Sequence, residues 1–279
     1  MSIKLDLHVH SESRGRIFIN EQQLVNSLRQ NRLDGVAITN FNDISHAVWL
    51  KEKIEDYIVI VGQEIWTKDG HIVGLGLKER IADAMDVEKT IQEIHRQGGI
   101  AVAVHPYLYL GLGKKMASVS IDAVEVYNAL TGVAFIHNYL ARRTAERLNL
   151  PQLASTDISD ARFIGRSYTE VITDDKASVL ESIRAGRVKL FKRAMPVPIG
   201  FILGNFLALR DLEPCSFHAM PCFICGKSMS VRLFKEKFEC LDCKKSEFSR
   251  IACCNGHYLC KSCLLKRALN KNTDYSQGQ

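Results

Sequence analysis

The first 214 residues contain no cysteine, and the chain of 279 residues has no apolar run near the roughly 18 residues that a membrane span needs. The amino terminus, M-S-I-K-L-D-L-H, lacks the basic start and apolar stretch of a secretory signal peptide. There is no internal repeat and no low-complexity tract. With 46% hydrophobic and 24% charged residues, the chain is not a disordered polyelectrolyte. The sequence therefore predicts a globular cytoplasmic protein with no membrane partner.

Charge and cysteine divide the chain into two parts. Residues 1–214 hold 26 Lys and Arg against 26 Asp and Glu, whereas residues 215–279 hold 11 against 5 and carry the net charge of +6. All nine cysteines lie in the second part. In a cytoplasmic chain, C-x-x-C pairs indicate metal binding rather than disulfides. We expect a large domain over 1–195, a connecting segment over 196–214 and a small Cys-rich zinc-binding module over 215–279.

Short apolar strands alternate with helical patterns through the first 190 residues. Runs such as Y-I-V-I-V-G at 57–62 are typical of strands in a parallel sheet that helices cover on both faces. At least six strand–helix units fit a small α/β barrel better than an open sheet. The expected strands cover 3–7, 35–39, 57–62, 71–76, 100–104 and 123–127, with two more near 153 and 171, and the expected helices cover 21–33, 45–55, 87–97, 134–148 and 178–185.

Side chains that commonly bind metals stand at the ends of these strands. His8 and His10 follow the first strand and point to the same side, because strand side chains repeat every two residues. The carboxyl ends of barrel strands meet at one face, where active sites lie. Four imidazoles and two carboxylates gathered there suit two divalent metals bridged by one carboxylate. The six residues are His8, His10, Glu64, His71, His105 and Asp157.

The motifs around these residues follow one another as in a known family. They are D-L-H-V-H-S at 6–11, A-I-T-N at 37–40, G-Q-E-I at 62–65, H-I-V-G-L-G at 71–76, A-V-H-P at 103–106, V-E-V-Y-N at 124–128, S-T-D at 155–157 and S-I-R-A-G-R at 182–187. In this order they resemble the PHP (polymerase and histidinol phosphatase) family over residues 1–195. The resemblance implies a distorted (β/α)7 barrel that binds Mn, Fe or Zn and hydrolyses phosphate esters.

Carried over position by position, the resemblance gives each of the six residues a role. One metal and the catalytic set would be formed by His8, His10, Glu64 and Asp157. Glu64 would bridge to a second metal, which His71 and His105 would also hold. A hydroxide activated by the two metals would then attack phosphorus in line.

Two positions depart from the family's pattern. The family reads T-D-H-D where this chain has T-N-F-N at 39–42, and S-D-A-H where this chain has T-D-I-S at 156–159. Phe41 and Ser159 therefore replace two histidines that normally help to bind a third metal. Both substitutions remove ligands of the same metal, so we expect the third site to be absent and the two-metal site to keep its ligands. Either the enzyme works with two metals, which we favour, or catalysis has weakened while binding persists.

Candidate substrate contacts carry a weaker signal. Asn40 stands where the family has Asp, and Asn128 ends the V-E-V-Y-N motif, where it either lines the pocket or packs at the strand end. Arg14 and Arg162 lie in loops after strands that carry ligands. A guanidinium there could grip phosphate through two hydrogen bonds, and a solvated loop charge is the alternative.

The Cys-rich part shows the spacing of structural zinc sites. Pairs at Cys222/Cys225 and Cys240/Cys243 are separated by fourteen residues, and a C-x-x-H-x-x-C-x-x-C run follows. Eight such ligands predict two tetrahedral zinc ions. We favour an interleaved arrangement, in which each early Cys pair shares a zinc ion with one late pair, because a single ten-residue segment would wrap awkwardly around one ion. Sequential zinc ribbons are the alternative. Cys253 is expected to be an ordinary buried thiol. The run consists of Cys254, His257, Cys260 and Cys263.

These features support two functions from different classes. The first is a metal-dependent phosphoesterase that acts on a phosphomonoester or phosphodiester, with a nucleotide or an oligonucleotide 5′ end favoured and 5′–3′ exonuclease action included. The second is a weakened barrel that binds nucleic acid or protein through its zinc module. Basic residues of that module, among them Arg232, Lys235 and Lys237, are candidates for phosphate contacts. The sequence indicates no oligomeric state.

Overall fold

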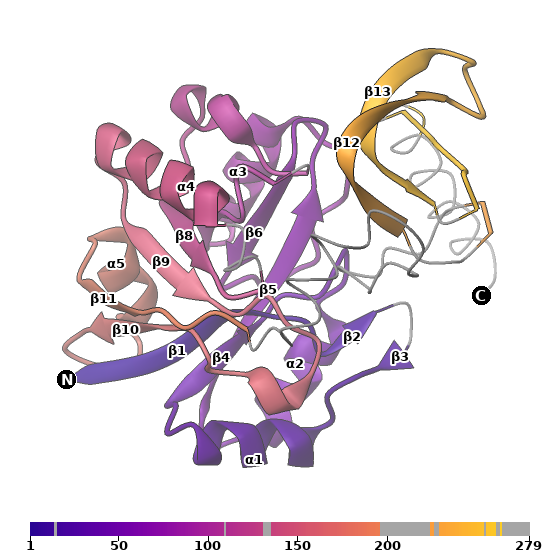
Figure 1. The fold of residues 1–279 in the computed structure, drawn as a ribbon. Helices are drawn as coiled ribbons and strands as arrows, with labels where there is room; N and C mark the ends of the chain where they lie inside the picture. Colours follow the sequence, from indigo (N-terminus) through magenta and orange to yellow (C-terminus); the bar gives the residue numbers. More distant parts are fainter. Residues whose placement is uncertain are drawn as a thin grey trace. The chain divides into compact units, whose positions relative to one another are not determined.

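A nine-stranded mixed sheet forms the scaffold of the first 195 residues (Figure 1). The computed structural model describes residues 1–13, 16–108, 110–130, 135–195, 224–225, 229–253, 255–260 and 263. The chain divides into two compact units, Met1–Met195 and Pro196–Gln279. The expected connecting segment over 196–214 lies outside the described residues.

The first unit alternates strands and helices along the chain. Its helices are α1 (Glu21–Gln30), α2 (Ser45–Lys53), α3 (Val87–Arg96), α4 (Phe135–Leu148) and α5 (Val179–Arg184), with short 3-10 turns at Gly113–Ser118 and Ala161–Phe163. Its strands are β1 (Ser2–Val9), β2 (Glu12–Ser13), β3 (Arg16–Ile17), β4 (Gly35–Ile38), β5 (Ile58–Trp66), β6 (His71–Leu75), β7 (Ile100–Ala103), β8 (Ala123–Asn128), β9 (Gln152–Ser155), β10 (Tyr168–Ile172) and β11 (Val188–Phe191). The order in the main sheet is β11-β10-β1-β4-β5-β6-β7-β8-β9, and β2 and β3 form a separate hairpin.

Seven of these strands, β1 and β4 to β9, form a nearly closed barrel. An isolated parallel bridge joins Val9 to Ile158, and the Asp157 N–H donates to the His8 carbonyl over 2.8 Å, so the segment after β9 meets the end of β1. This confirms the predicted distorted (β/α)7 barrel. Two of the expected strands depart from the parallel sheet that the sequence suggested: β6 runs antiparallel to both β5 and β7, and β10 runs antiparallel to β1. The hairpin of β10 and β11 extends the sheet beyond β1.

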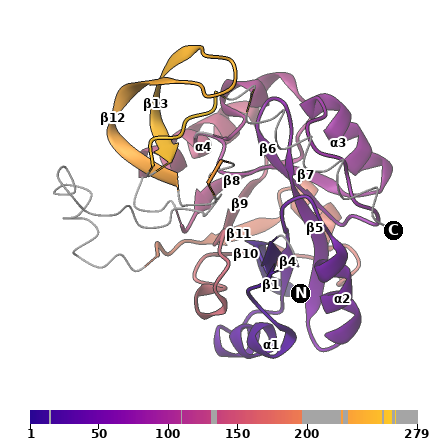
Figure 2. The ribbon, with the colours of Figure 1, turned by 90° about the vertical axis from the view of Figure 1, so that its right-hand side faces the viewer.

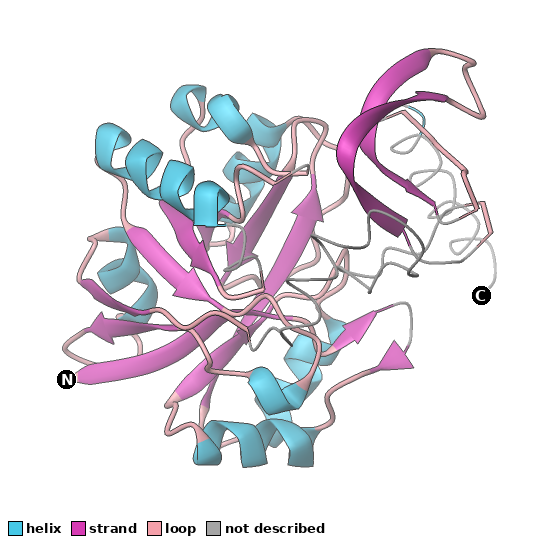
Figure 3. Ribbon diagram, viewed as in Figure 1, coloured by secondary structure: helices cyan, strands magenta, loops and turns pink. Residues whose placement is uncertain are grey.

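Apolar side chains pack on both sides of the barrel wall. The helices lie on the outer side of this wall (Figures 2 and 3). Along β7, Ile100 and Val102 belong to the cluster inside the barrel, whereas Ala101 and Ala103 belong to the cluster beneath the helices. This alternation follows from the two-residue period of a strand. Because both faces are covered, the strands read as near-continuous apolar runs, and the polar residues at their ends stand out.

The second unit is built on one hairpin. Strands β12 (Met229–Glu239) and β13 (Ser246–Cys253) pair antiparallel around a tight turn, in which the Lys244 N–H donates to the Cys240 carbonyl over 3.0 Å. The rings of Phe238 and Tyr258 stack with centroids 5.4 Å apart, and they pack beside buried cysteines. Across the described part of both units, no helix is long and apolar enough to cross a membrane.

Candidate metal centres

The barrel brings all six predicted ligands to one end of its strands. His8 and His10 lie at and just after the end of β1, His105 follows β7, and Asp157 follows β9. His71 is the first residue of β6 rather than the last. Because β6 is antiparallel to its neighbours, its start lies at the same face as their ends. Glu64, near the end of β5, completes the set.

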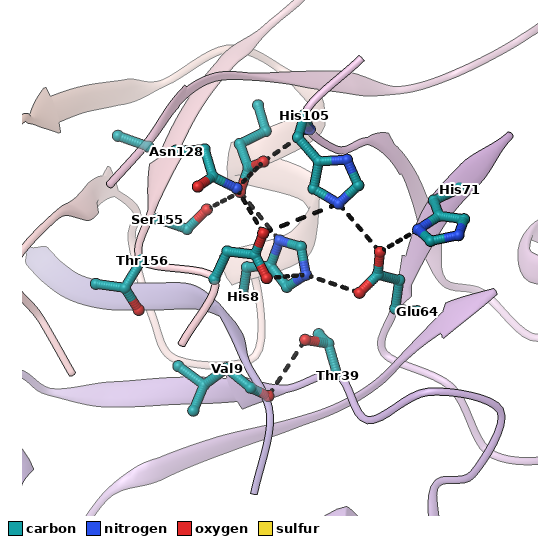
Figure 4. A network of polar contacts seen from close by, with 12 residues as sticks. His8, Val9, Thr39, Glu64, His71, His105, Asn128, Ser155 and Thr156 are labelled. Carbon is teal, nitrogen blue, oxygen red and sulfur yellow. Dashed lines mark hydrogen bonds and ion pairs between the residues drawn. The ribbon is translucent and has the colours of Figure 1, made fainter. Parts of the chain in front are cut away.

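Glu64 stands at the centre of the group, and its two oxygens face different partners (Figure 4). Oε2 lies 3.2 Å from His8 Nε2 and 3.1 Å from His10 Nε2. Oε1 lies 2.7 Å from His71 Nδ1 and 3.1 Å from His105 Nε2. Asp157 Oδ1 lies 3.3 Å from His10 Nε2 and thus joins the first pair. The donor atoms therefore form two groups that share Glu64, with the ligand atoms of each group within 4.8 Å of one another.

Burial and charge at this cluster suit cations. Side-chain exposure is 1% for Glu64 and Asp157 and at most 8% for the four histidines. Burial alone would raise the pKa of Glu64, but hydrogen bonds from His10, His105 and His71 outweigh it and hold that pKa well below its usual range. A buried ionised carboxylate surrounded by imidazole nitrogens matches the donor set of Zn²⁺, Mn²⁺ or Fe²⁺.

Two of the ligands occupy unusual backbone conformations. His105 has φ 29° and Asp157 has φ 57°, both in the left-handed region that non-glycine residues seldom adopt. Such strain persists where the surrounding structure fixes it, and it gathers at functional sites. The Asp157 turn is fixed by Asp6, whose carboxylate accepts the Thr156 N–H at 3.0 Å and the Thr156 hydroxyl at 2.6 Å. Burial raises the pKa of Asp6 to about 6 despite these donors.

A second carboxylate, Glu125 of β8, supports the cluster from behind, and the sequence reasoning did not identify it. It is 1% exposed and lies 3.0 Å from His8 Nδ1. It also accepts the His105 backbone N–H at 2.8 Å, the Asn128 amide at 3.0 Å and the Ser155 hydroxyl. A proton on His8 Nδ1 donated to Glu125 leaves the Nε2 lone pair facing Glu64 and Asp157, so Glu125 fixes the tautomer that binds a metal.

We expect Glu125→Gln to weaken metal binding at the barrel by about 10- to 100-fold. The amide is neutral, and its NH₂ group would face a donor where the carboxylate now accepts. Chelator competition on the purified variant measures the loss. Glu146→Gln, on the exposed face of α4, serves as the matched control. Equal affinities in Glu125→Gln and wild type would show that Glu125 does not orient His8.

The predicted substrate residues fall into three classes. Asn40 and Asn128 are almost fully buried and hold other groups in place: Asn40 Oδ1 accepts the Ser11 N–H at 2.7 Å, and Asn128 Nδ2 donates to Asp157 at 2.8 Å. Arg162 is exposed and bound to Asp160, with Nε 3.0 Å from Oδ1. Arg14 lies outside the described residues. The two buried amides thus hold backbone and ligand groups of the site in place, and a contact between either of them and a substrate stays a prediction.

Phe41 occupies a specific place beside the cluster. Its ring stacks on His10 with centroids 4.5 Å apart, and Trp66 stacks on His71 at 5.1 Å. An imidazole at position 41 would have offered a nitrogen next to His10, whereas the phenyl ring offers only packing. Ser159, the other departure, is exposed beyond Asp157. Among the described residues, these two positions contribute to neither group of donor atoms in the barrel.

In the second unit, Cys240 and Cys243 from the hairpin turn lie together with Cys260 and Cys263. Cys243 Sγ is 3.6 Å from Cys260 Sγ, and the Cys260 N–H donates to Cys240 Sγ over 3.3 Å. Burial would raise the pKa of the Cys240 thiol, but backbone N–H groups, chiefly that of Cys243, lower it to about 6. A thiolate held by N–H donors among three more thiols fits a tetrahedral zinc site. This is the interleaved pairing of the second pair with the last.

A second group in this unit includes a residue that the sequence did not predict as a ligand. Cys253 Sγ lies 3.4 Å from Cys225 Sγ, and both belong to a cluster with His257. Cys253 was expected to be an ordinary buried thiol, but its sulfur lies among atoms that could hold a metal. It ends β13 opposite Met229, so the register of the hairpin decides where its thiol lies. Cys222 and Cys254 lie outside the described residues.

The chain is similar in sequence or in fold to several known proteins. A family model described as PHP-associated matches residues 135–188. An uncharacterized protein of Methanocaldococcus jannaschii is 32% identical over 166 residues, which is 54% of this chain and 96% of that protein.

Two crystal structures share the fold. The first is a two-domain protein from Bacteroides vulgatus containing a predicted PHP-like metal-dependent phosphoesterase, with TM-score 0.59 and 15% identity over 92% of this chain and 88% of its own. The second is PsfC from Pseudomonas syringae, with TM-score 0.56 and 14% identity over 75% of this chain and 99% of its own.

Proposed function

The chain belongs to the PHP (polymerase and histidinol phosphatase) family, and on that premise we propose that it is a phosphoesterase working with two divalent metals. The single observation that carries the proposal is the position of Glu64. One of its oxygens faces His8 and His10, and the other faces His71 and His105. A carboxylate shared in this way is what two adjacent cations require, whereas one structural ion would leave half of the donors without a role.

Bound at these donors, divalent cations would supply Lewis-acid chemistry, which lowers the pKa of water and stabilises charge on phosphate oxygens. The chain's own residues fix the frame for this chemistry. Glu125 orients His8, Asn128 holds Asp157, and Asp6 fixes the turn that carries Asp157. Because these supports are buried and hydrogen-bonded, the ligands are organised in advance, and little reorganisation is needed during reaction.

We favour a phosphomonoester or phosphodiester of a nucleotide, or the 5′ end of an oligonucleotide with 5′–3′ exonuclease action, as the substrate. The Cys-rich part of the chain holds 11 Lys and Arg against 5 Asp and Glu, a balance that attracts polyanions. In this proposal two structural zinc ions hold that unit together, and its basic surface binds the nucleic acid. Ions of Mn, Fe or Zn would occupy the two proposed metal sites of the barrel.

The experiment uses full-length protein loaded with Mn²⁺. It is assayed on p-nitrophenyl phosphate, on the bis ester and on short 5′-phosphorylated oligonucleotides. We expect metal-dependent release of product that His8→Ala abolishes, because His8 reaches both Glu64 and Asp157. His95→Ala is the matched control, since His95 sits on α3 and bonds Asp122 outside the cluster.

Each outcome points to one function. Hydrolysis of oligonucleotides from the 5′ end supports the exonuclease form of the proposal, and hydrolysis of the small monoester alone supports a phosphatase. If none of the substrates is hydrolysed while two metals are bound per barrel, catalysis is rejected and a binding module is favoured.

A further inference from the structure

A polar groove lies between α1 and the segment that follows Asp157, and none of its lining residues is a ligand of the metal cluster. Its volume is about 540 Å³, within the range of small-molecule sites. One wall is α1 with the end of the loop that follows β1, and the other is the segment after Asp157. The lining residues are Ile17, Phe18, Gln23, Asn26, Ser27, Gln30, Ser159, Asp160, Ala161 and Arg162.

Backbone hydrogen bonds link both walls to residues next to ligands of the first metal group. The Phe18 N–H donates to the Ser11 carbonyl over 2.8 Å, which ties one wall to the residue after His10. The His10 N–H donates to the Ile158 carbonyl over 2.9 Å, directly before the other wall begins at Ser159. The walls are joined further out, where the Ser27 hydroxyl donates to the Ala161 carbonyl over 2.6 Å. Each wall is therefore linked through the backbone to the segment that carries a ligand of the first metal group, His10 on one side and Asp157 on the other.

The lining favours a neutral group with hydrogen-bonding edges. Gln23, Asn26 and Gln30 are spaced by three and four residues and so lie on one face of α1. The two charged residues of the lining, Asp160 and Arg162, pair with each other, with Arg162 Nε 3.0 Å and 3.1 Å from the two carboxylate oxygens. Their charges cancel, so a phosphate gains little here compared with the metal cluster.

We propose that this groove binds the nucleobase of a nucleotide whose phosphate lies at the metal cluster. The inference rests on the proposed function and names its substrate class. The Gln30 amide matches a base edge, as Asn and Gln do with adenine, whereas the oxygens of Gln23 and Asn26 already accept from Asn20 and Gln22. Phe18 and the guanidinium plane of Arg162 offer flat surfaces for stacking. A sugar alone could satisfy amides, but it has no planar face for these groups.

Three phosphodiesters with one leaving group test this assignment. They are the p-nitrophenyl esters of adenosine 5′-phosphate, ribose 5-phosphate and methyl phosphate, each given to the full-length, Mn²⁺-loaded protein. We expect KM for the adenosine ester to be about tenfold below that of the other two. Gln30→Ala, and Ser159→Trp, which fills the groove, should remove most of this difference. Gln92→Ala, an exposed amide on α3 outside the lining, should preserve it.

Equal KM values for all three esters in the wild type, or an adenosine advantage that survives both groove variants, would overturn the assignment. An equal advantage for the ribose ester would assign the groove to sugar instead and also overturn it. Calorimetric titration with adenosine 5′-monophosphate tests the groove without turnover. A protein that hydrolyses nothing but loses AMP affinity in Gln30→Ala would reject the phosphoesterase and keep the groove, whereas AMP affinity unchanged in that variant would reject the groove.

Discussion

If the barrel holds two metals as proposed, Glu64→Gln is expected to lower turnover by about a thousandfold or more, because it removes the ligand that both metals would share and with it several kcal/mol of transition-state stabilisation. The amide keeps the volume of the carboxylate, so packing around it changes little. Only one of its atoms can act as a ligand, and its NH₂ group would point at one pair of imidazoles. We expect metal content to fall below two ions per barrel. Metal analysis and p-nitrophenyl phosphate kinetics on the same sample measure both effects.

The control for this change is Glu88→Gln, on the exposed side of α3. It removes the same charge from the same unit without reaching the cluster. Circular dichroism and the melting temperature separate a folding defect from a site defect. If Glu64→Gln kept both metals and turned over at the wild-type rate, Glu64 would not be a bridge, and the two-metal proposal would fail.

The sequence could predict much of the barrel cluster, because its signals are local. Val, Ile and Leu runs mark the strands, and the two-residue period places His8 and His10 on one side. His71 begins its strand in the sequence prediction and in the structure alike, and the reversed direction of β6 brings that start to the face where the other candidate ligands lie. Strand direction depends on connections and packing, which a residue pattern does not encode.

Glu125 shows what the motif reading missed. It lies between Val124 and Val126 in a buried strand, and a carboxylate in such a run needs partners to offset its desolvation. That mismatch was visible in A-V-E-V-Y-N and could have marked Glu125 as a support for the ligands. Its partners could not be named, since His8 is 117 residues away in the chain. Only the closure of the barrel brings Glu125 and these partners together.

In the second unit, ligand spacing predicted one group and missed a member of the other. C-x-x-C pairs predicted the interleaved group around Cys240 and Cys260, and the structure brings those thiols together. Cys253 stands outside the C-x-x-C spacing, so the pattern gave no reason to count it as a ligand. The register of β12 and β13 pairs Cys253 with Met229, and the Cys253 thiol lies beside that of Cys225.

Cys240→Ser is expected to remove about one zinc ion per chain and to unfold the second unit, because the free energy of zinc binding stabilises the fold of that unit. Structural zinc contributes about 10–16 kcal/mol, which matches or exceeds the stability of about 5–15 kcal/mol typical of a whole domain. Cys240 is fully buried, and its sulfur accepts the Cys260 N–H. Zinc release to a chromogenic chelator and protease resistance of the hairpin measure the two effects. Leu241→Ser, in the same turn and 40% exposed, tests for general disruption and should keep the zinc. Full zinc content with an intact hairpin in Cys240→Ser would show that the four thiols do not share an ion, and the unit would then owe its fold to the stacked Phe238 and Tyr258 rather than to metal.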